Sequence, residues 1–290
     1  MLVVGVPARY KTIAITTRYW KPGEDHLEHI VSSIKNHVED GDIVTISEKA
    51  ISTATGNILD ESIIHSGWAA RFLAKYWMRL VWGYVLGPLC HLRKRTIQHL
   101  RAYPTREGSI HKQLVLEHAG LLQALMLGSE GGIDASNLPY SYVSLPLRKA
   151  QQTAERIRER IKSELGKDVV VMIVDTDKTY SIRGFHFTPR PNPIKGIHSR
   201  GFVAYIFGRF LKLKRRATPT AVAGSKMLIE EALEIADIAN RVRRFGAGGT
   251  VWDMAKAFKV SLGGVTWEML EKVEHRPIVI IKRNMCARLS

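Results

Sequence analysis

The sequence predicts a mixed α/β fold (α/β or α+β), and three observations lead to this prediction. Residues 169–174 are an unbroken apolar run, mostly β-branched, which is typical of a strand buried on both faces. Residues 150–165 place apolar side chains at helical spacing directly before that strand, and Gly166 can end the helix. Residues 25–39 and 43–47 repeat this order of helix and strand. Helices and strands that follow one another in this way favour a layered α/β architecture.

The composition of the segments between these elements predicts their structure. Residues 47–57 are polar, and we expect them to close in a turn at Thr55-Gly56-Asn57. Residues 66–92 and 114–127 are apolar and predict two helices, the second of which runs into a turn at Gly131-Gly132. No internal repeat is present, so we expect residues 1–290 to form one functional unit, in which residues 66–106 resemble an insertion.

The last third of the chain is assigned in the same way. Residues 188–193 carry a proline at every second position and must be extended, because each proline lacks an amide donor and constrains the residue before it. Ser225 can cap a helix over residues 226–244, whose acids precede its bases as the helix dipole favours. Residues 278–281 predict a final short strand.

The composition excludes several classes of protein. With 290 residues, 45% apolar and 24% charged, the chain is neither disordered nor a collagen or coiled-coil rod. Cys90 and Cys286 are too few for a disulfide framework or a cysteine-based zinc site, and the N-terminus lacks the order of a signal peptide. We therefore expect a cytoplasmic protein.

The net charge of +16 is concentrated in two stretches that contain no acid. Residues 62–106 hold eight bases and residues 178–226 hold eleven. Such stretches indicate either that the protein binds an anionic partner or that these charges are solvated at its surface. A nucleotide with an anionic small substrate is our first interpretation. The alternative is a nucleic acid, bound by Lys and Arg side chains that are interspersed with Trp and Tyr.

Residues 66–92 are the most apolar part of the chain, yet they do not predict a transmembrane helix. Arg71, Lys75 and Arg79 recur every fourth residue and would place a charged stripe in the bilayer. A core or dimer-interface helix with one basic face is the first interpretation. A helix lying in a membrane interface is the alternative.

Three segments could carry chemistry. Asp175, Thr176 and Asp177 follow the buried strand, where ligand sites of α/β sheets gather, and their oxygens suit Mg²⁺ or Mn²⁺. The same residues also occur in ordinary turns. Residues 131–137 contain Asp134, Ser136 and Asn137 after two glycines. This segment could be a ligand-binding loop or an ordinary turn. Residues 246–250 are glycine-rich and could approach phosphate, but they lack the lysine of a P-loop.

Five motifs in this order resemble the coenzyme F-420-0:L-glutamate ligase (γ-glutamyl ligase) family. They are KPGED at residues 21–25, DGD at 40–42, IVTISEK at 43–49, GGIDASN at 131–137 and VDT at 174–176. With the loops before and after them, the resemblance spans residues 17 to about 250. It implies a mixed α/β fold of two interleaved lobes, an intertwined homodimer, and a ligase that uses GTP, or ATP, with Mn²⁺ or Mg²⁺.

The resemblance also implies roles for individual residues. The metal ligands would be Asp134, Asp175 and Thr176. The nucleotide would contact Thr17, Arg18, Tyr19, Trp20, Ser47, Glu48, Lys49, Asn137, Gly246, Gly248, Gly249 and Thr250. No catalytic side chain is assigned. An acyl phosphate intermediate would form, since the metal and a lysine can offset phosphate charge.

The chain departs from the family pattern at several points. Thr17-Arg18-Tyr19 is polar where that loop is mostly apolar, Thr53 stands in place of a second lysine, and Ala247 replaces a polar residue. Residues 66–106 have no counterpart in the usual ligase. The acceptor could therefore differ from coenzyme F-420-0, and a protein without catalytic activity stays open as an alternative.

Overall fold

A mixed sheet forms the base of the molecule, which we describe from a computed structural model covering residues 7–128 and 130–284. Its strand order is β1-β9-β2-β5-β6-β7, with β8 paired to β5, and only the β2–β5 and β6–β7 pairs are parallel. A two-stranded sheet joins β3 to β4. The strands are β1 (Tyr10–Thr17), β2 (Ile43–Ser47), β3 (Ile58–Asp60), β4 (Tyr142–Ser144), β5 (Val170–Ile182), β6 (Phe185–Thr188), β7 (His198–Ser199), β8 (Lys214–Ala223) and β9 (His275–Arg283).

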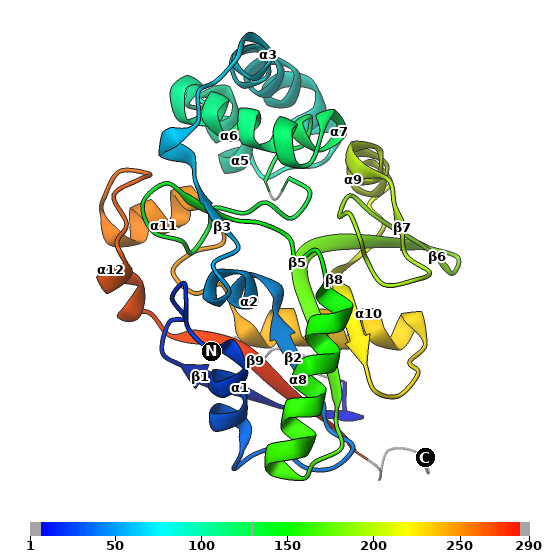
Figure 1. The fold of residues 1–290 in the computed structure, drawn as a ribbon. Coiled ribbons are helices and arrows are strands. Elements are labelled where there is room, and N and C mark those ends of the chain that lie inside the picture. Colours follow the sequence, from blue (N-terminus) through cyan, green and yellow to red (C-terminus); the bar gives the residue numbers. More distant parts are fainter. Residues whose placement is uncertain (1–6, 129, 285–290) are drawn as a thin grey trace.

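Helices cover both faces of the large sheet and build a separate helical lobe above it (Figure 1). The helices are α1 (His26–Ile34), α2 (Glu48–Ala54), η1 (Glu61–Ile63), α3 (Trp68–Phe72), η2 (Leu73–Leu86), α4 (Gly87–Leu89), α5 (Lys94–Arg101), α6 (Thr105–His118), α7 (Leu121–Ala124), α8 (Ala150–Leu165), α9 (Gly201–Phe210), α10 (Ile229–Arg243), α11 (Val251–Phe258) and α12 (Trp267–Glu271). The mixed α/β fold expected from the sequence is confirmed.

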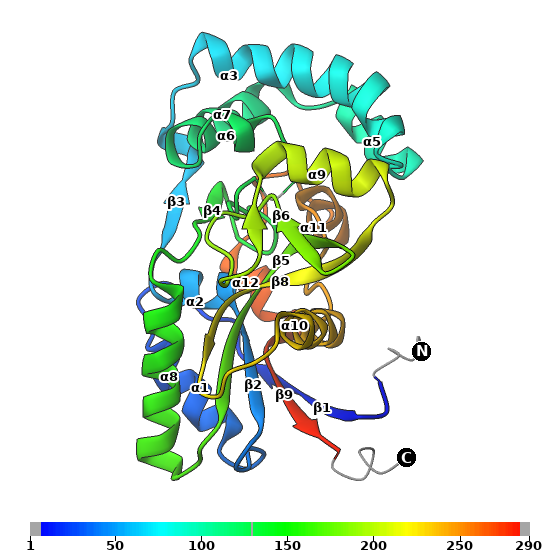
Figure 2. The ribbon, with the colours of Figure 1, turned by 90° about the vertical axis from the view of Figure 1, so that its right-hand side faces the viewer.

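The sheet lies between two helical layers, as Figure 2 shows edge-on. On one face, α1 and α8 pack against the strands through a core that includes Ile30, Ile157 and Ile173. On the other face, α10 packs through Ile235 and its neighbours onto Met172 of β5. Both sides of β2 and β5 are thus buried, which explains their unbroken apolar sequence.

Several predicted boundaries are confirmed and others are wrong. Residues 150–165 form α8, ended by Gly166 with φ +67°. The helix predicted over residues 25–39 ends at Ile34, and the one over 226–244 begins at Ile229, without a cap from Ser225. The polar segment after β2 is a helix, α2, rather than a loop. The apolar run over 114–127 is divided among α6, a break at Gly120 and α7.

Residues 68–89 form one long helical segment whose central part, η2, is a π-helix. Its buried residues Ala70, Ala74, Met78, Trp82 and Gly87 recur every four or five residues, with Leu73 and Gly83 beside them. This recurrence agrees with the wider turn of a helix whose hydrogen bonds span five residues. The buried side packs against α5 and α6 and, through Trp82, against α9.

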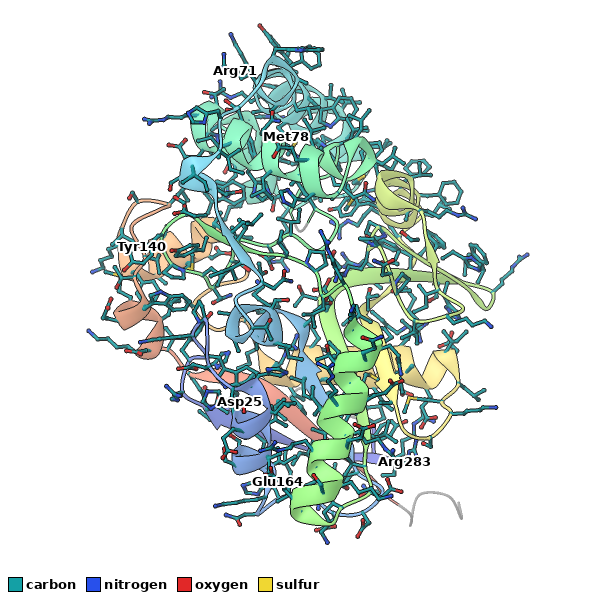
Figure 3. All side chains as sticks on the ribbon, viewed as in Figure 1. Asp25, Arg71, Met78, Tyr140, Glu164 and Arg283 are labelled. Atoms are coloured by element: carbon teal, nitrogen blue, oxygen red, sulfur yellow. The ribbon has the colours of Figure 1, made fainter. Side chains whose placement is uncertain are left out.

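The opposite side of this segment is exposed and carries large apolar side chains next to the exposed bases Arg71 and Lys75. Trp68 is 83% exposed, and Phe72, Leu80 and Tyr84 are more than half exposed. Figure 3 places Arg71 at the outer edge of the helical lobe and Met78 within it. The core interpretation therefore holds for one side of the segment, while its other side remains uncovered on the single chain.

Two further expectations concern membrane-spanning helices and the cysteines. Within the described residues, no helix combines the length and the apolar character needed to cross a membrane. Cys90 is buried as a free thiol, and Cys286 lies outside the described residues.

Candidate functional site

The parallel strands β2 and β5 stop pairing at the same level. Ser47 and Val174 are their last paired residues, after which α2 begins at Glu48 and β5 continues into Asp175 and Thr176. Ligand sites in α/β sheets gather at such carboxyl ends. The sheet therefore brings together two polar motifs that lie far apart in the sequence.

The prediction that the strand ends before Asp175 is wrong. β5 runs on to Ile182, and Asp175 and Lys178 are paired with Thr218 and Ala217, which are adjacent on β8. Between these pairs β5 has two more residues than β8, so the strand bulges. A bulge bends a strand and redirects its side chains. Asp175 and Thr176 can thus face a cleft although they lie within a strand.

Arg190 is the buried centre of this region, and the sequence did not single it out. Its side chain is 2% exposed. Nη2 donates to Glu48 Oε1 at 2.5 Å, Nη1 donates to the Gly131 carbonyl at 2.8 Å, and Nε lies 2.9 Å from Asp175 Oδ2. Burial alone would lower the pKa of Arg190, but the charges of Glu48 and Asp175 outweigh it and raise the pKa above its usual value. The guanidinium therefore stays charged.

The glycine turn leaves space for the Arg190 side chain, and the proline segment restricts the Arg190 backbone. Gly132 has φ +90°, and a Cβ there would lie 1.2 Å from Arg190 Nη1, so glycine is required by conformation and by space. Pro189 and Pro191 restrict the backbone on either side of Arg190. The sequence feature that could have pointed to Arg190 is an arginine between two prolines in a stretch without acids.

Lys49 and Asp134 form the second charged contact of the site. Lys49 Nζ donates to the Asp134 carboxylate, to Ser136 Oγ at 2.8 Å and to the Ser136 carbonyl at 2.9 Å. The Ser136 amide in turn donates to Asp134 Oδ1 at 2.8 Å. Burial tends to raise the pKa of Asp134, but the Lys49 charge and these hydrogen bonds lower it overall. Asp134 is therefore ionised at neutral pH.

A cleft of about 150 Å³ opens over these two charged contacts, and we call it the central cleft. Eleven of the residues predicted from the sequence line it: Tyr19, Trp20, Ser47, Lys49, Asp134, Asn137, Asp175, Thr176, Gly246, Gly248 and Gly249. Residues that the sequence interpretation did not assign to a site also line it, among them Arg243, Arg244, His275 and Arg276.

Asn137 joins three of the predicted loops at this cleft. Its side chain accepts a hydrogen bond from the Ala247 amide at 2.8 Å and donates to the Gly248 carbonyl at 2.9 Å. The Tyr19 hydroxyl donates to the Asn137 carbonyl. The amides of Ala247 and Gly248 are thus engaged within the protein, since Gly248 donates to the Phe245 carbonyl. This loop shapes the wall of the cleft rather than offering those two amides to a ligand.

Four predicted residues lie outside the wall of the central cleft. Glu48 is buried beneath it on Arg190, and Arg18 is exposed and pairs with Glu24 at 2.7 Å. Thr17 ends β1 next to His275, 3.1 Å from its Nδ1. Thr250 caps α11 by accepting from the Asp253 amide, and it lines a neighbouring cavity.

Two of the additional residues have strongly shifted pKa values. Burial lowers the pKa of Arg243 to about 10, so this arginine remains a cation at neutral pH. Burial lowers the pKa of His275 to about 4, although the Arg18 carbonyl lies 3.0 Å from Nδ1 and opposes the shift. His275 is therefore neutral at physiological pH.

The oxygen donors at the cleft suit a divalent ion that arrives with phosphate. Within the described residues, no cluster of three or more His, Cys, Asp or Glu side chains could enclose a metal. Mg²⁺, however, commonly uses one or two carboxylates together with substrate phosphates and water. Asp134, Asp175 and Thr176 offer such a partial set, with Asp175 Oδ2 buried and without a hydrogen bond among the described residues.

The two basic stretches carry less free positive charge than their composition suggests. Arg190 is internal, and Arg216 is 4% exposed and bonded to Glu230. Arg101 donates to the Gly83 carbonyl at 2.9 Å, and Arg209 donates to the Cys90 carbonyl at 3.2 Å. Arg190 and Arg216 are thus buried in ion pairs, whereas most bases of residues 62–106 are exposed.

Comparison with known proteins connects this geometry to a family. Residues 14–225 match the sequence profile described as F420-0:Gamma-glutamyl ligase. The chain is also 41% identical, over 282 residues, to the uncharacterized protein MJ1361 of Methanocaldococcus jannaschii, covering 92% of this chain and 94% of that protein. The matched region of the profile contains the β2–α2 junction, the glycine turn, Asp175 and Arg190.

The first prediction concerns Arg190. Arg190→Met should destabilise the fold by about 3–5 kcal/mol, because it leaves Glu48 and Asp175 buried without their cation. Arg156→Met, on the exposed face of α8, is the matched control and should change stability by less than about 0.5 kcal/mol. Urea denaturation monitored by circular dichroism measures both. Equal stabilities of the two variants would show that the buried arginine does not hold the site.

The second prediction concerns His275. Its folded-state pKa lies below its unfolded value of about 6.5, so the unfolded state binds more protons between pH 6.5 and 4. Stability is complete above pH 6.5 and should fall by about 3 kcal/mol as the pH drops towards 4. His275→Asn should lose this component, which is measured as the difference between the wild-type and variant unfolding curves across that range. Parallel pH profiles of the two proteins would contradict the assignment.

Proposed function

The chain belongs to the F420-0:gamma-glutamyl ligase family, and on this premise we propose that its central cleft activates a carboxylic acid with a nucleotide and joins it to an amine. The proposal rests on one observation: two carboxylates, each held by a buried or half-buried cation, meet at the ends of the parallel strands. Lys49 holds Asp134, and Arg190 holds Asp175. This arrangement supports a nucleotide and divalent metal site.

The charges of the cleft suit a nucleoside triphosphate. Lys49 and Arg243 reach it from opposite sides of the sheet junction, on α2 and at the end of α10. Both are cations that can offset phosphate charge where the surrounding protein excludes water. Asp134, Asp175 and Thr176 would hold Mn²⁺ or Mg²⁺, which when bound would neutralise further charge on the phosphates.

The proposed reaction has two displacements. A carboxylate oxygen of the acid attacks the γ-phosphorus of the nucleotide. The bond between the γ-phosphorus and the oxygen of the nucleoside diphosphate breaks, and its electron pair stays on that oxygen. The amine nitrogen then attacks the acyl carbon of the acyl phosphate, and the C–O bond to phosphate breaks. The incoming ammonium loses two protons in total, one of which the departing phosphate can take. Lys49 and Arg243 would orient the phosphates for both displacements.

The third prediction tests the metal-dependent site. Asp134→Asn and Asp175→Asn should each abolish Mn²⁺-dependent GTP binding, because either change removes a full charge from a divalent site. Calorimetric titration with GTP in the presence of Mn²⁺ measures the effect, and the same titration with ATP distinguishes the two nucleotides. Thermal unfolding monitors the integrity of the fold in each variant.

The matched control is Asp168→Asn, which removes a carboxylate whose side chain is 61% exposed at the opposite end of the sheet. It should bind GTP as the wild type does. Asp134→Asn is the more decisive variant, because Asp175→Asn also disturbs Arg190. If both site variants fold and titrate like the wild type, the metal-site proposal is wrong.

We also propose that the exposed apolar face of residues 68–89 is the subunit contact of a homodimer. The support is its extent, since Trp68, Phe72, Leu80 and Tyr84 are exposed together, and large apolar patches normally mark interaction sites. Trp77 is unsuitable for a test because its Nε1 donates to the Leu125 carbonyl inside the lobe.

The fourth prediction is therefore that Phe72→Asp with Leu80→Asp yields monomers by light scattering, while Phe72→Leu with Leu80→Met remains dimeric. A double Asp variant that stays dimeric but no longer sediments with anionic vesicles would show that this face meets lipid instead.

A further inference from the structure

A second cavity of about 310 Å³ adjoins the central cleft, and we call it the lobe cavity. Asp134, Ser136, Thr176 and Gly249 line both spaces, so these residues lie between the two. Its volume lies within the range of small-molecule sites. Part of its wall comes from the helical lobe, through η2, α5 and α6.

Most of the wall of the lobe cavity is apolar. Met78, Leu100 and Leu127 contribute from the helical lobe, while Ile133, Trp252 and Met254 close the side towards the central cleft and α11. Met78, Leu100 and Met254 are each at most 1% exposed, so they lie beneath the surface of the wall, whereas Leu127 and Trp252 are partly exposed. A ligand that fills this space must present a largely apolar surface to gain from the burial.

Acids outnumber cations among the residues that line the lobe cavity. Glu61, Glu107, Glu130 and Asp134 line it together with His111, and among the described lining residues there is no Lys or Arg. This is unexpected in a chain with a net charge of +16. A ligand carboxylate or phosphate would face several like charges and could pair only with His111, which is already bonded to Glu61, so the cavity disfavours such ligands.

A buried cluster forms the polar end of the lobe cavity. His111 Nδ1 lies 2.5 Å from Glu61 Oε1, and His111 Nε2 lies 3.9 Å from Glu130 Oε2. Lys112, fully buried behind the wall, donates to Glu130 Oε1 at 2.6 Å and to the carbonyls of Ala124 and Met126. Glu130 is 1% exposed, and its Oε2 has no hydrogen-bond partner among the described residues.

The charges within this cluster balance one another, and a further acid lines the cavity beside it. Burial lowers the pKa of His111, but the charge of Glu61 and its hydrogen bond outweigh this effect and raise the pKa overall. Protonated His111 and Lys112 can balance Glu61 and Glu130, while Glu107 keeps the mouth of the cavity negative. The unpartnered oxygen of Glu130 offers an acceptor for a further N–H group.

We propose that the lobe cavity binds the amine substrate of the ligase, and that this substrate is an apolar primary amine rather than glutamate. The inference rests on the proposed function of the central cleft. The amine end would lie at Glu61 and Glu130 and the apolar body against Leu127 and Trp252. Glutamate fits poorly because its two carboxylates would be buried among acids, with His111 already bonded to Glu61.

The experiment compares three probes of similar size that differ in one group: phenethylamine, 2-phenylethanol and 3-phenylpropionate. Fluorescence titration of the full chain measures their affinities, and Trp252→Phe identifies the contribution of the cavity tryptophan to the signal. We expect phenethylamine to bind at least tenfold more tightly than 3-phenylpropionate, with the alcohol between them. Equal or tighter binding of the acid, or no binding of any probe, would overturn the proposal.

Two variants locate the amine. Glu61→Gln and Glu130→Gln should each reduce the preference for phenethylamine over 2-phenylethanol at least fivefold. Glu159→Gln, an exposed carboxylate of α8, should leave that preference unchanged. If Glu130→Gln fails to fold because Lys112 loses its counter-ion, Glu61→Gln still decides the question. An unchanged preference in folded Glu61→Gln contradicts an amine site at this cluster.

Titration of the same samples with GTP and Mn²⁺ separates this inference from the proposed function. Wild-type protein that binds phenethylamine but no nucleotide would refute the ligase proposal and retain an amine site. Protein that binds nucleotide but shows no amine preference would retain the central cleft and refute the inference. Glu61→Gln should bind the nucleotide normally, since Glu61 does not line the central cleft.

Discussion

The buried guanidinium of Arg190 is the contact on which the site depends. It holds the start of α2 through Glu48, the bulged part of β5 through Asp175 and the glycine turn through the Gly131 carbonyl. Each of these segments contributes a neighbouring residue to the central cleft. A buried ion pair adds little net stability, yet removing one partner leaves an uncompensated charge. Its role here is to fix how three segments from different parts of the chain meet.

The two neighbouring cavities differ in the charges that line them. The central cleft has both bases, among them Lys49 and Arg243, and acids, whereas the lobe cavity has acids and one histidine. Asp134 and Ser136 stand at the boundary of both. In the proposed reaction the phosphorylated acid would occupy the central cleft and the amine the lobe cavity, and these shared residues would lie between the two reactants.

The sequence predicts the sheet core and much of the cleft for clear physical reasons. Burial on both faces requires the continuous apolar run of β5, and Asp134 and Asp175 belong to motifs of a known family. Arg190 was missed because its partners are 59 and 142 residues away in sequence. The bulge after Asp175 was missed because it depends on pairing with β8, which local sequence does not encode. The π-helical spacing of η2 likewise emerges only from packing within the lobe.

The most direct test of the central claim is a crystal structure of the protein with a non-hydrolysable GTP analogue and Mn²⁺. The account predicts the triphosphate in the central cleft beside Lys49 and Arg243, with Mn²⁺ between Asp134, Asp175 and the phosphates, and with Arg190 still bonded to Glu48. Anomalous scattering from manganese would locate the ion without ambiguity. A nucleotide bound elsewhere on the chain, or manganese away from both aspartates in a structure with the nucleotide bound, would contradict the account.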